Sequence, residues 1–423
     1  MIHEHVLIEQ SPALSGTVPL VGAKNAVLVS MASLILTAGL SKLTNVPFSN
    51  DVEQMIQLLR DLGASILVDY ANNSLEIDTT DLCHWRVNVE IMKKMRASIL
   101  VMGPLLARFG KADIALPGGC LIGARPIDFH LKAFAKMGVT IETSGEYLTS
   151  RVTDLKAQRF VLEYPSVGAT ENIMMAATRA IGTTHILNAA LEPEVFDLIE
   201  ILQKMGASIA VEAPATIVIQ GVKELRPLEH KVMYDRLEAG SLLLAAAITG
   251  GEIIIPEAPT DYMDVFLVKL QEMGHEINKT ADGKGLHFKA TKYPQAVSFK
   301  TMPYPGFPTD LQAPMTAALC LASGTSIVHE TVFENRLLHV RELQKMGAQI
   351  SIDNNTATIK GVEQLYGAQV IATDIRASCA LVLAGLAATG QTTMTGVHHL
   401  KRGYQGFAEK IAALGGKVAI KSS

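Results

Sequence analysis

The stretch LLRDLGASI, residues 58–66, joins the end of a helix to the start of a strand. Glycine ends helices because it adopts the left-handed conformation at little cost. The apolar residues before Gly63 fall on one helical face; they are Val52, Met55, Leu59 and Leu62. The phrase returns as AFAKMGVTI (133–141), ILQKMGASI (201–209), KLQEMGHEI (269–277), ELQKMGAQI (342–350) and KIAALGGKV (410–418). Copies spaced by roughly 70 residues predict a repeated α/β unit.

A second phrase, an apolar helix rich in small residues that ends in glycine, recurs in the same register. Its copies are LTAG (36–39), LARFG (106–110), TRAIG (178–182), AAITG (246–250), CLASG (320–324) and LAATG (386–390). Alternating stretches such as SILVDYANNSLEID (65–78) predict hairpins between the helices. The first helix of each unit is apolar nearly all round and is expected inside its domain, whereas the second has a polar face.

The length and composition indicate a large two-domain α/β protein. The chain has 423 residues, of which 48% are hydrophobic, so two domains are expected. Six units then give three per domain, which predicts a pseudo-threefold domain used twice. The polar segment 221–235 is the expected linker between them. A formal net charge of -4 gives no basic field that would favour nucleic acid.

Nothing in the sequence predicts a membrane segment or a metal site. The N-terminus MIHEHVLIEQ lacks the apolar core of a signal peptide, and the apolar stretch 26–40 is too short and too polar for a membrane span. The four cysteines show no zinc spacing, which favours free thiols in a reducing cytoplasm. We expect Cys83, Cys320 and Cys379 to be packing residues. The pair His398–His399 has no accompanying carboxylate or cysteine that would suggest a metal.

Cations stand where the buried helices are predicted to begin. Lys24, Arg96 and Arg376 lie near such starts, although a cation at the positive end of a helix is unfavourable unless an anion binds there. The remaining inner helices are expected to begin near 170–172, 235–238 and 309–310. Three outer helices are also expected to open with cations, namely Arg125, Arg336 and Arg402. Together these residues predict a binding site for an anionic ligand.

The segment PGGCLIGARP (117–126) is predicted to be a loop, because glycine and proline oppose both helix and strand. Cys120 lies in this loop with Arg125 nearby, and a neighbouring cation favours a reactive thiolate. Cys120 is therefore a candidate catalytic residue rather than a packing one.

Several motifs taken in order resemble the UDP-N-acetylglucosamine 1-carboxyvinyltransferases, enolpyruvyl transferases of the EPSP synthase superfamily. The motifs are GAKNA (22–26), MRAS (95–98), LARFG (106–110), PGGCLIGARP (117–126), PSVGATENIMMAA (165–177), FPTDLQA (307–313), ETVFENR (330–336), ATDIRAS (372–378) and RGY (402–404). The match spans nearly the whole chain. It implies a two-domain inside-out α/β barrel with six repeats. The implied domains are residues 24–234, which carry the cysteine loop, and residues 1–23 with 235–423, with the active site in the cleft between them.

The resemblance also implies the reaction and its setting. The 3-hydroxyl of UDP-N-acetylglucosamine would add to C2 of phosphoenolpyruvate, and phosphate would leave, giving the enolpyruvyl ether. This is the first committed step of peptidoglycan synthesis, in the cytoplasm, and the target of fosfomycin. No metal or organic cofactor, nucleic acid, membrane or obligate protein partner is implied.

Site residues are carried over by matching motif. Cys120 matches the general acid that protonates C3 and forms a covalent adduct with phosphoenolpyruvate, and Asp310 matches the carboxylate placed at the sugar hydroxyl. The implied phosphoenolpyruvate-binding residues are Lys24, Asn25, Arg125 and Arg402, of which Lys24 and Arg402 are also implied in catalysis. The implied nucleotide-sugar contacts are Arg96, Arg125, Pro126, Ile127, Asp128, Phe129, Tyr164, Pro165, Ser166, Val167, Asp310 and Val332. Because the acid must be a thiol, activity is expected to fall as pH rises.

The chain departs from the family pattern at three places. Tyr164-Pro165 stand where some relatives carry Lys, Val29 stands where many have Pro, and Gln405 replaces a common Glu. Any phosphate contact from that Lys must therefore come from elsewhere.

The nearest alternative function is that of the sister transferase acting on shikimate 3-phosphate, and the other is that of a silent paralogue that only binds UDP-N-acetylglucosamine. The loop cysteine and the nucleotide-sugar motifs disfavour the first, and retention of Lys24, Cys120, Asp310 and Arg402 disfavours the second.

Overall fold

The computed structural model describes residues 4–115 and 127–422 and divides them into two compact units. We call residues 22–115 with 127–233 the N-terminal unit, and residues 4–21 with 234–422 the C-terminal unit. Each unit has its own hydrophobic core, since the two clusters of buried apolar residues share no member. The loop with Cys120, Arg125 and Pro126 lies outside the described residues.

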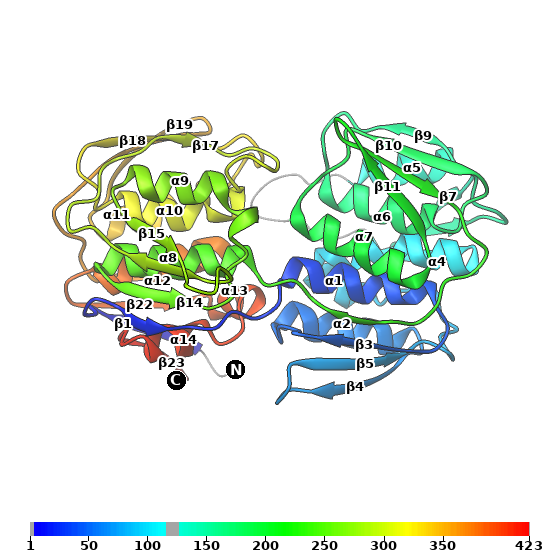
Figure 1. Ribbon diagram of the computed structural model, residues 1–423, viewed down its shortest axis with the longest axis horizontal. Helices are drawn as coiled ribbons and strands as arrows, with labels where there is room; N and C mark the ends of the chain where they lie inside the picture. The colour runs from blue at the N-terminus through cyan, green and yellow to red at the C-terminus, as the bar shows by residue number, and fades with distance from the viewer. Residues whose placement is uncertain (1–3, 116–126, 423) are drawn as a thin grey trace. The chain divides into compact units, whose positions relative to one another are not determined.

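The N-terminal unit alternates helices with short strands (Figure 1). Its helices are α1 Lys24–Ser33, η1 Leu34–Leu36, α2 Asn50–Asp61, α3 Val89–Lys94, η2 Arg96–Val101, α4 Met102–Phe109, α5 Asp128–Lys136, α6 Val167–Ala177 and α7 Pro193–Met205. Its strands are β3 Leu40–Thr44, β4 Ser65–Asp69, β5 Ser74–Asp78, β6 Lys111–Ala115, β7 Thr140–Ser144, β8 Tyr147–Arg151, β9 Arg159–Val161, β10 Thr183–Leu187, β11 Ser208–Glu212, β12 Thr216–Gln220 and β13 Glu229–Lys231. In the described part they form sheets of order β13-β3-β5-β4, β6-β8-β7 and β11-β12-β10-β9.

The C-terminal unit has the same kind of architecture. Its helices are α8 Arg236–Thr249, η3 Thr260–Tyr262, α9 Asp264–Glu272, η4 Thr309–Leu311, α10 Gln312–Leu319, α11 His339–Lys345, α12 Ile375–Ala387, α13 Val397–Gly403 and α14 Phe407–Ala413. Its strands are β1 Glu4–Glu9, β2 Ser15–Thr17, β14 Glu252–Ile255, β15 Glu276–Lys279, β16 Leu286–Lys289, β17 Phe299–Lys300, β18 Thr325–His329, β19 Gln349–Asp353, β20 Thr356–Lys360, β21 Gln369–Ile371, β22 Gln391–Thr395 and β23 Val418–Ser422. Its described sheets have the orders β21-β22-β1-β23, β15-β16-β14-β2 and β17-β18-β20-β19.

Helices buried on nearly every side form the centre of each unit. In the N-terminal unit these helices are α1, which packs on the outer helix α7, and α6, which packs on α4; in the C-terminal unit they are α8, α10 and α12, with α8 and α10 packed on α12. The buried helices are rich in alanine and other small residues, which allow close approach on all faces. Helix α2 buries one face and exposes the other, and Val52, Met55, Leu59 and Leu62 are fully buried. The inner and outer helix types predicted from the sequence are therefore confirmed.

The glycines of both repeated phrases lie between a helix and the next strand, but α6, α10 and α12 end at Ala177, Leu319 and Ala387, several residues before the glycines at which they were expected to end. All of them, from Gly39 and Gly63 through Gly415, have positive φ. The stretch 65–78 is an antiparallel hairpin in which Ser65 pairs with Asp78, also as predicted.

The expected linker at 221–235 is wrong in part. Residues 229–231 form β13, which pairs in parallel with β3 of the N-terminal unit, Glu229 opposite Lys42. Alternate side chains, His230 and Val232, are buried there, so this polar-looking segment completes a sheet. The domain boundaries predicted at 23/24 and 234/235 stay predictions.

The helix start expected at 170–172 is wrong, whereas α1 begins at Lys24 as predicted. Helix α6 begins at Val167, because the Ser166 side chain caps it by accepting from the Ala169 amide. Helix α1 ends at Ser33 and continues only as a 3₁₀ turn to Leu36. Among the described residues, no helix is both long enough and apolar enough to cross a membrane.

Gly22 stands against the neighbouring backbone just before α1. A Cβ atom at Gly22 would lie 1.9 Å from the carbonyl oxygen of Asn45. No side chain fits there, so glycine is required for the approach of these two segments.

We predict that Gly22→Ala lowers the free energy of unfolding of the N-terminal unit by about 2–4 kcal/mol, because backbone must move. Gly168→Ala is the matched control: it is helical, and its Cβ would lie 3.6 Å from the His130 ring. That change should be neutral or stabilise by up to about 1 kcal/mol. Urea unfolding of both variants measures this, and equal stability of Gly22→Ala and wild type would contradict it.

Candidate functional site

Lys24 is the first residue of α1 and is 9% exposed. Its ammonium group lies 3.2 Å from a carboxylate oxygen of Asp51, in the first turn of α2. Asp51 thus supplies a counter-charge at the place where the helix dipole disfavours a cation. The neighbouring Asn25 is exposed. The start of α1 therefore carries an ammonium paired with a carboxylate and, beside it, the exposed amide of Asn25.

Arg96 begins the 3₁₀ helix η2 and is half-buried. The sequence placed it at the start of a buried α-helix, but α4 begins only at Met102. The intervening 3₁₀ turn moves Arg96 away from the α4 N-terminus.

Asn172 ties three segments of the N-terminal unit together. Its side-chain oxygen accepts from the Gly103 amide at 2.7 Å, and its NH₂ group donates to the Ile99 carbonyl at 2.9 Å. The same NH₂ group lies 3.0 Å from Nδ1 of His130. Since an amide NH₂ can only donate, His130 accepts at Nδ1 and carries its proton on Nε2.

The segments joined by Asn172 carry most of the predicted nucleotide-sugar residues that the structure describes. They are η2 with Arg96, the start of α5 with Asp128 and Phe129, and the start of α6 with Ser166 and Val167. Asp128 accepts from Lys132 at 2.9 Å, and the Lys132 ammonium lies over the Phe129 ring. Hydrogen bonding to Lys132 lowers the pKa of Asp128. Tyr164 is exposed and its carbonyl accepts from the Ser166 amide, whereas Ile127 is buried.

Asp310 lies between two buried arginines of the C-terminal unit. One oxygen accepts from Arg336 at 2.6 Å and the other from Arg376 at 2.8 Å. The side chains of Arg336 and Arg376 are 3% and 5% exposed, whereas that of Asp310 is 25% exposed. The carboxylate is thus held by two guanidinium groups, one at each oxygen, and stays partly exposed.

Glu330 aligns the backbone on which Asp310 and Val332 stand. One oxygen accepts from the Thr301 hydroxyl and from the amides of Val332 and Phe333, and the other from the Thr309 hydroxyl. Glu330 is 1% exposed, and a buried carboxylate is tolerated because its oxygens are satisfied. It therefore couples η4 to the segment before α11.

Arg376 stands in the first turn of α12 beneath an acidic cap. The Asp374 side chain accepts from the amides of Arg376 and Ala377 and satisfies this helix end. Burial alone would lower the pKa of Arg376, but the nearby Asp310, Tyr404 and Asp235 raise it well above its ordinary value. The residue is a permanent cation, as its predicted role at a helix start requires.

The prediction that Arg402 opens an outer helix is wrong. Arg402 lies in the last turn of α13, and the outer helix α14 begins at Phe407 after Gly406, which has φ 62°. A cation in the last turn suits the helix dipole. Arg402 therefore needs no bound anion to explain its position, although its predicted role stays open.

The cysteines differ in exposure. Cys320 and Cys379 are buried, as expected of packing residues, and burial raises the pKa of Cys320 to about 12. Cys83 is exposed, so the expectation that it is a packing residue is wrong. It follows Leu82, the apolar residue that fills the core at this point.

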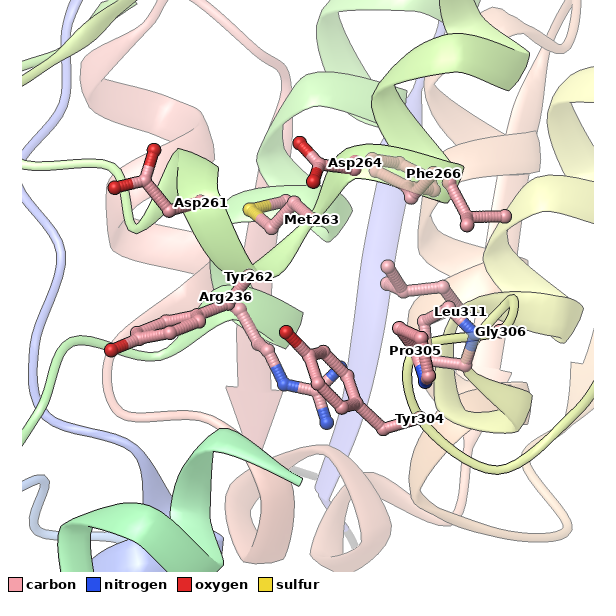
Figure 2. A pocket seen from close by; sticks show the side chains of 12 residues that line it. Arg236, Asp261, Tyr262, Met263, Asp264, Phe266, Tyr304, Pro305, Gly306 and Leu311 are labelled. Carbon is pink, nitrogen blue, oxygen red and sulfur yellow. The ribbon is translucent and has the colours of Figure 1, made fainter. Parts of the chain in front are cut away.

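One hollow lies in each unit, and that of the C-terminal unit is lined in part by Pro308 and Leu311, which flank Thr309 and Asp310. The one in Figure 2 is a small hollow in the C-terminal unit. Its lining includes Arg236, Tyr304, Met263 and Leu311. A wider hollow in the N-terminal unit is lined by residues that include Trp85, Arg86 and Tyr147. None of the predicted site residues is among the lining residues of either hollow.

Residues that sequence reasoning missed are mainly uncharged or buried partners. Asn172, His130, Glu330 and Tyr404 hold the predicted residues in place. His130 lies among the buried residues of α5. The sequence pattern there indicates only core packing and does not predict a hydrogen-bonding role. Across the described ranges, no group of three or more His, Cys, Asp or Glu side chains is placed to hold a metal ion.

A family model described as EPSP synthase (3-phosphoshikimate 1-carboxyvinyltransferase) matches residues 8–411. The chain is 48% identical to UDP-N-acetylglucosamine 1-carboxyvinyltransferase 1 of Caldanaerobacter subterraneus, over 98% of this chain and 99% of that one. It is 46% identical to the UDP-N-acetylglucosamine 1-carboxyvinyltransferase of Geotalea uraniireducens, over the same shares.

Solved structures show the same mixed α/β fold. The enolpyruvyl transferase NikO from Streptomyces tendae superposes with a TM-score of 0.91 at 22% identity, covering 100% of both chains. EPSP synthase from Acinetobacter baumannii gives a TM-score of 0.77 at 18% identity, covering 99% of this chain and 100% of that one.

The environment of His130 predicts a pH dependence of stability. Burial, and then the charge of Arg96, lower the pKa of His130 to about 4, whereas the unfolded value is about 6.5. The unfolded state therefore binds more protons between these values, and stability falls as pH drops below about 6.5. His130→Gln should remove about 2 kcal/mol of the wild-type loss between pH 7 and pH 5.

Urea unfolding at both pH values measures this difference. The matched control is His84→Gln, because His84 is exposed on the same unit, and it should leave the loss unchanged. An identical pH dependence for His130→Gln and wild type would show that the imidazole is not kept neutral in the folded state.

Proposed function

The chain belongs to the EPSP synthase family of enolpyruvyl transferases, and we propose that it transfers the enolpyruvyl group of phosphoenolpyruvate to UDP-N-acetylglucosamine. The observation that carries the proposal is the 46–48% identity, over nearly the full length, to relatives that bear the corresponding name. The product would be the 3-enolpyruvyl ether, at the first committed step of peptidoglycan synthesis in the cytoplasm.

The proposed reaction is an addition followed by an elimination. The sugar 3-hydroxyl oxygen bonds to C2 of phosphoenolpyruvate, its proton passes to Asp310, and the Cys120 thiol gives a proton to C3. The bond from C2 to the phosphate oxygen then breaks, phosphate leaves, and C3 loses a proton to restore the double bond. Cys120 also forms the proposed covalent adduct with phosphoenolpyruvate.

The proposed roles fit the chemistry of the described residues. Asp310 is held by two guanidinium groups that favour its ionised form, as a proton acceptor needs. Lys24 and Arg402 are cations that suit the multiply charged phosphoenolpyruvate, together with Asn25 and Arg125. Fixed cations also stabilise negative charge as it moves onto the departing phosphate.

We further propose the finer architecture that the family resemblance implies. In it each unit is an inside-out α/β barrel of three repeats, and residues from both units act on one pair of substrates. The sheet orders and the buried central helices of each unit support this proposal.

The second candidate is transfer to shikimate 3-phosphate, which the description of the family model favours. Identity to the EPSP synthase of known structure is only 18%, so the first proposal is preferred. A purely binding paralogue is disfavoured because the chain retains Lys24, Cys120, Asp310 and Arg402, the residues proposed for catalysis.

We predict that the purified protein releases phosphate from phosphoenolpyruvate when UDP-N-acetylglucosamine is present and not when shikimate 3-phosphate replaces it. A coupled phosphate assay with each acceptor measures this. Release only with shikimate 3-phosphate would establish the second candidate, and no release with either acceptor would indicate a binding protein.

We predict that Cys120→Ser loses most turnover and resists alkylation by the epoxide fosfomycin, because a hydroxyl is a poorer acid and nucleophile than a thiol. Cys83→Ser is the matched control, since it removes the exposed thiol of the N-terminal unit and should change neither property. Activity of the wild type should also fall as pH rises and the Cys120 thiol ionises. Full turnover by Cys120→Ser would remove this residue from the mechanism.

A further inference from the structure

Tyr404 is a buried tyrosine that no proposed step uses. It follows α13 as the last residue of the RGY motif and is 5% exposed. Its ring packs against Phe407 with centroids 4.8 Å apart. A phenylalanine would fill the same space, and burying a hydroxyl has a cost unless the hydroxyl is hydrogen-bonded. The partners of the Tyr404 hydroxyl therefore indicate its purpose.

The hydroxyl is the middle of a directed chain of hydrogen bonds. Arg376 donates from Nη1 to the Tyr404 oxygen at 3.0 Å, and that oxygen lies 3.0 Å from Oγ of Ser241. Ser241 donates its own proton to the Leu237 carbonyl at 2.8 Å. Since a hydroxyl carries one proton and Ser241 gives its proton to Leu237, Tyr404 is the donor in the bond to Ser241, and the Cys379 thiol is a further hydrogen-bonding neighbour of both hydroxyls. The chain therefore runs from Arg376 through Tyr404 and Ser241 to the first turn of α8.

This chain fixes the plane of the Arg376 guanidinium. Nη1 is bound to Tyr404 and Nη2 to Asp310, at 3.0 Å and 2.8 Å. A guanidinium is planar and rigid, so two contacts at different nitrogens set its orientation. Arg336 reaches the other oxygen of Asp310 from the segment before α11. The direction of Arg376 thus decides whether Asp310 keeps one cationic partner or two.

The surroundings of Arg376 favour this orientation over others. The nearby acidic groups include Asp310, Asp235 and Asp374; Asp235 caps α8 and Asp374 caps α12 by accepting from backbone amides. Burial raises the pKa values of Tyr404 and Cys379, so both stay neutral. On α11, His339 is buried beside Arg336 and its pKa is lowered to about 4 by burial, so it adds no charge near neutral pH. Tyr404 is therefore a neutral acceptor that leaves the Arg376 charge directed at Asp310.

We propose that Tyr404 is a positioning residue of the transfer reaction, whose hydroxyl holds Arg376 against Asp310 so that Asp310 is ionised and correctly directed. This inference rests on the proposed function. It assigns to the RGY tyrosine a task distinct from that of the neighbouring Arg402, because Tyr404 is buried and acts through Arg376.

The test is the Tyr404→Phe variant, which keeps the ring and removes the hydroxyl. Wild-type phosphate release from the two substrates is measured first, so that a failure of the proposed function is seen separately. In Tyr404→Phe, kcat should fall about 10- to 100-fold, with KM for both substrates within about twofold, since uniform binding is unaffected. The acid limb of the kcat–pH profile should move up by about 0.5–1 pH unit, because Asp310 loses part of its cationic support.

Two controls keep the result interpretable. Tyr293→Phe is the matched change at a tyrosine that is 78% exposed, and it should leave kcat and the profile unchanged. Thermal unfolding of each variant shows that it is folded at the assay temperature. If Tyr404→Phe does not fold, Arg376→Lys replaces it, because a single ammonium cannot span both Asp310 and Tyr404, and its acid limb should move the same way.

The outcomes separate cleanly when the wild type is active. A lower kcat with the shifted acid limb supports the inference. An unchanged kcat, or a lower kcat with the acid limb in its wild-type position, overturns it, since the hydroxyl would then be dispensable or purely structural. An unshifted limb in Arg376→Lys would likewise overturn it, because Tyr404 could not act through Arg376.

Discussion

One carboxylate bound by two buried guanidinium groups is the interaction on which the C-terminal unit is organised. Arg336 and Arg376 are almost fully buried, and a buried cation is unfavourable unless a counter-charge and hydrogen-bond acceptors meet it. Asp310 supplies the counter-charge for both. The elements that carry the three residues, η4, the segment before α11 and the start of α12, are therefore constrained to meet at this carboxylate. Glu330 and Tyr404 then fix the geometry from either side.

In the N-terminal unit, neutral side chains join the separate elements. Asn172 uses both ends of its amide to join α4, η2 and α5, and His130 stays uncharged beside Arg96. Lys24 is paired with Asp51 before any ligand arrives.

The inner and outer helix types, the positive-φ glycines and the cation at the start of α12 could be predicted because local sequence determines them. Glycine adopts the left-handed conformation at little cost wherever it occurs, and Arg376 drew attention because cations are unusual in a first helical turn. The partners could not be predicted in this way. Ser241 and Tyr404 are 163 positions apart, and Lys24 meets Asp51 only because α1 and α2 pack together. The positions of Arg402 in α13 and of Cys83 at the surface depended on turns whose boundaries the sequence left ambiguous.

The central claim is that Asp310, held by its two arginines, accepts the proton of the sugar hydroxyl. A crystal structure of this protein with UDP-N-acetylglucosamine bound tests it most directly. We expect the 3-hydroxyl oxygen at about 2.6–3.2 Å from the Asp310 carboxylate, with Arg336 and Arg376 still bound to that carboxylate. A sugar whose 3-hydroxyl lies beyond the reach of Asp310, or a carboxylate released by both arginines, would contradict the account.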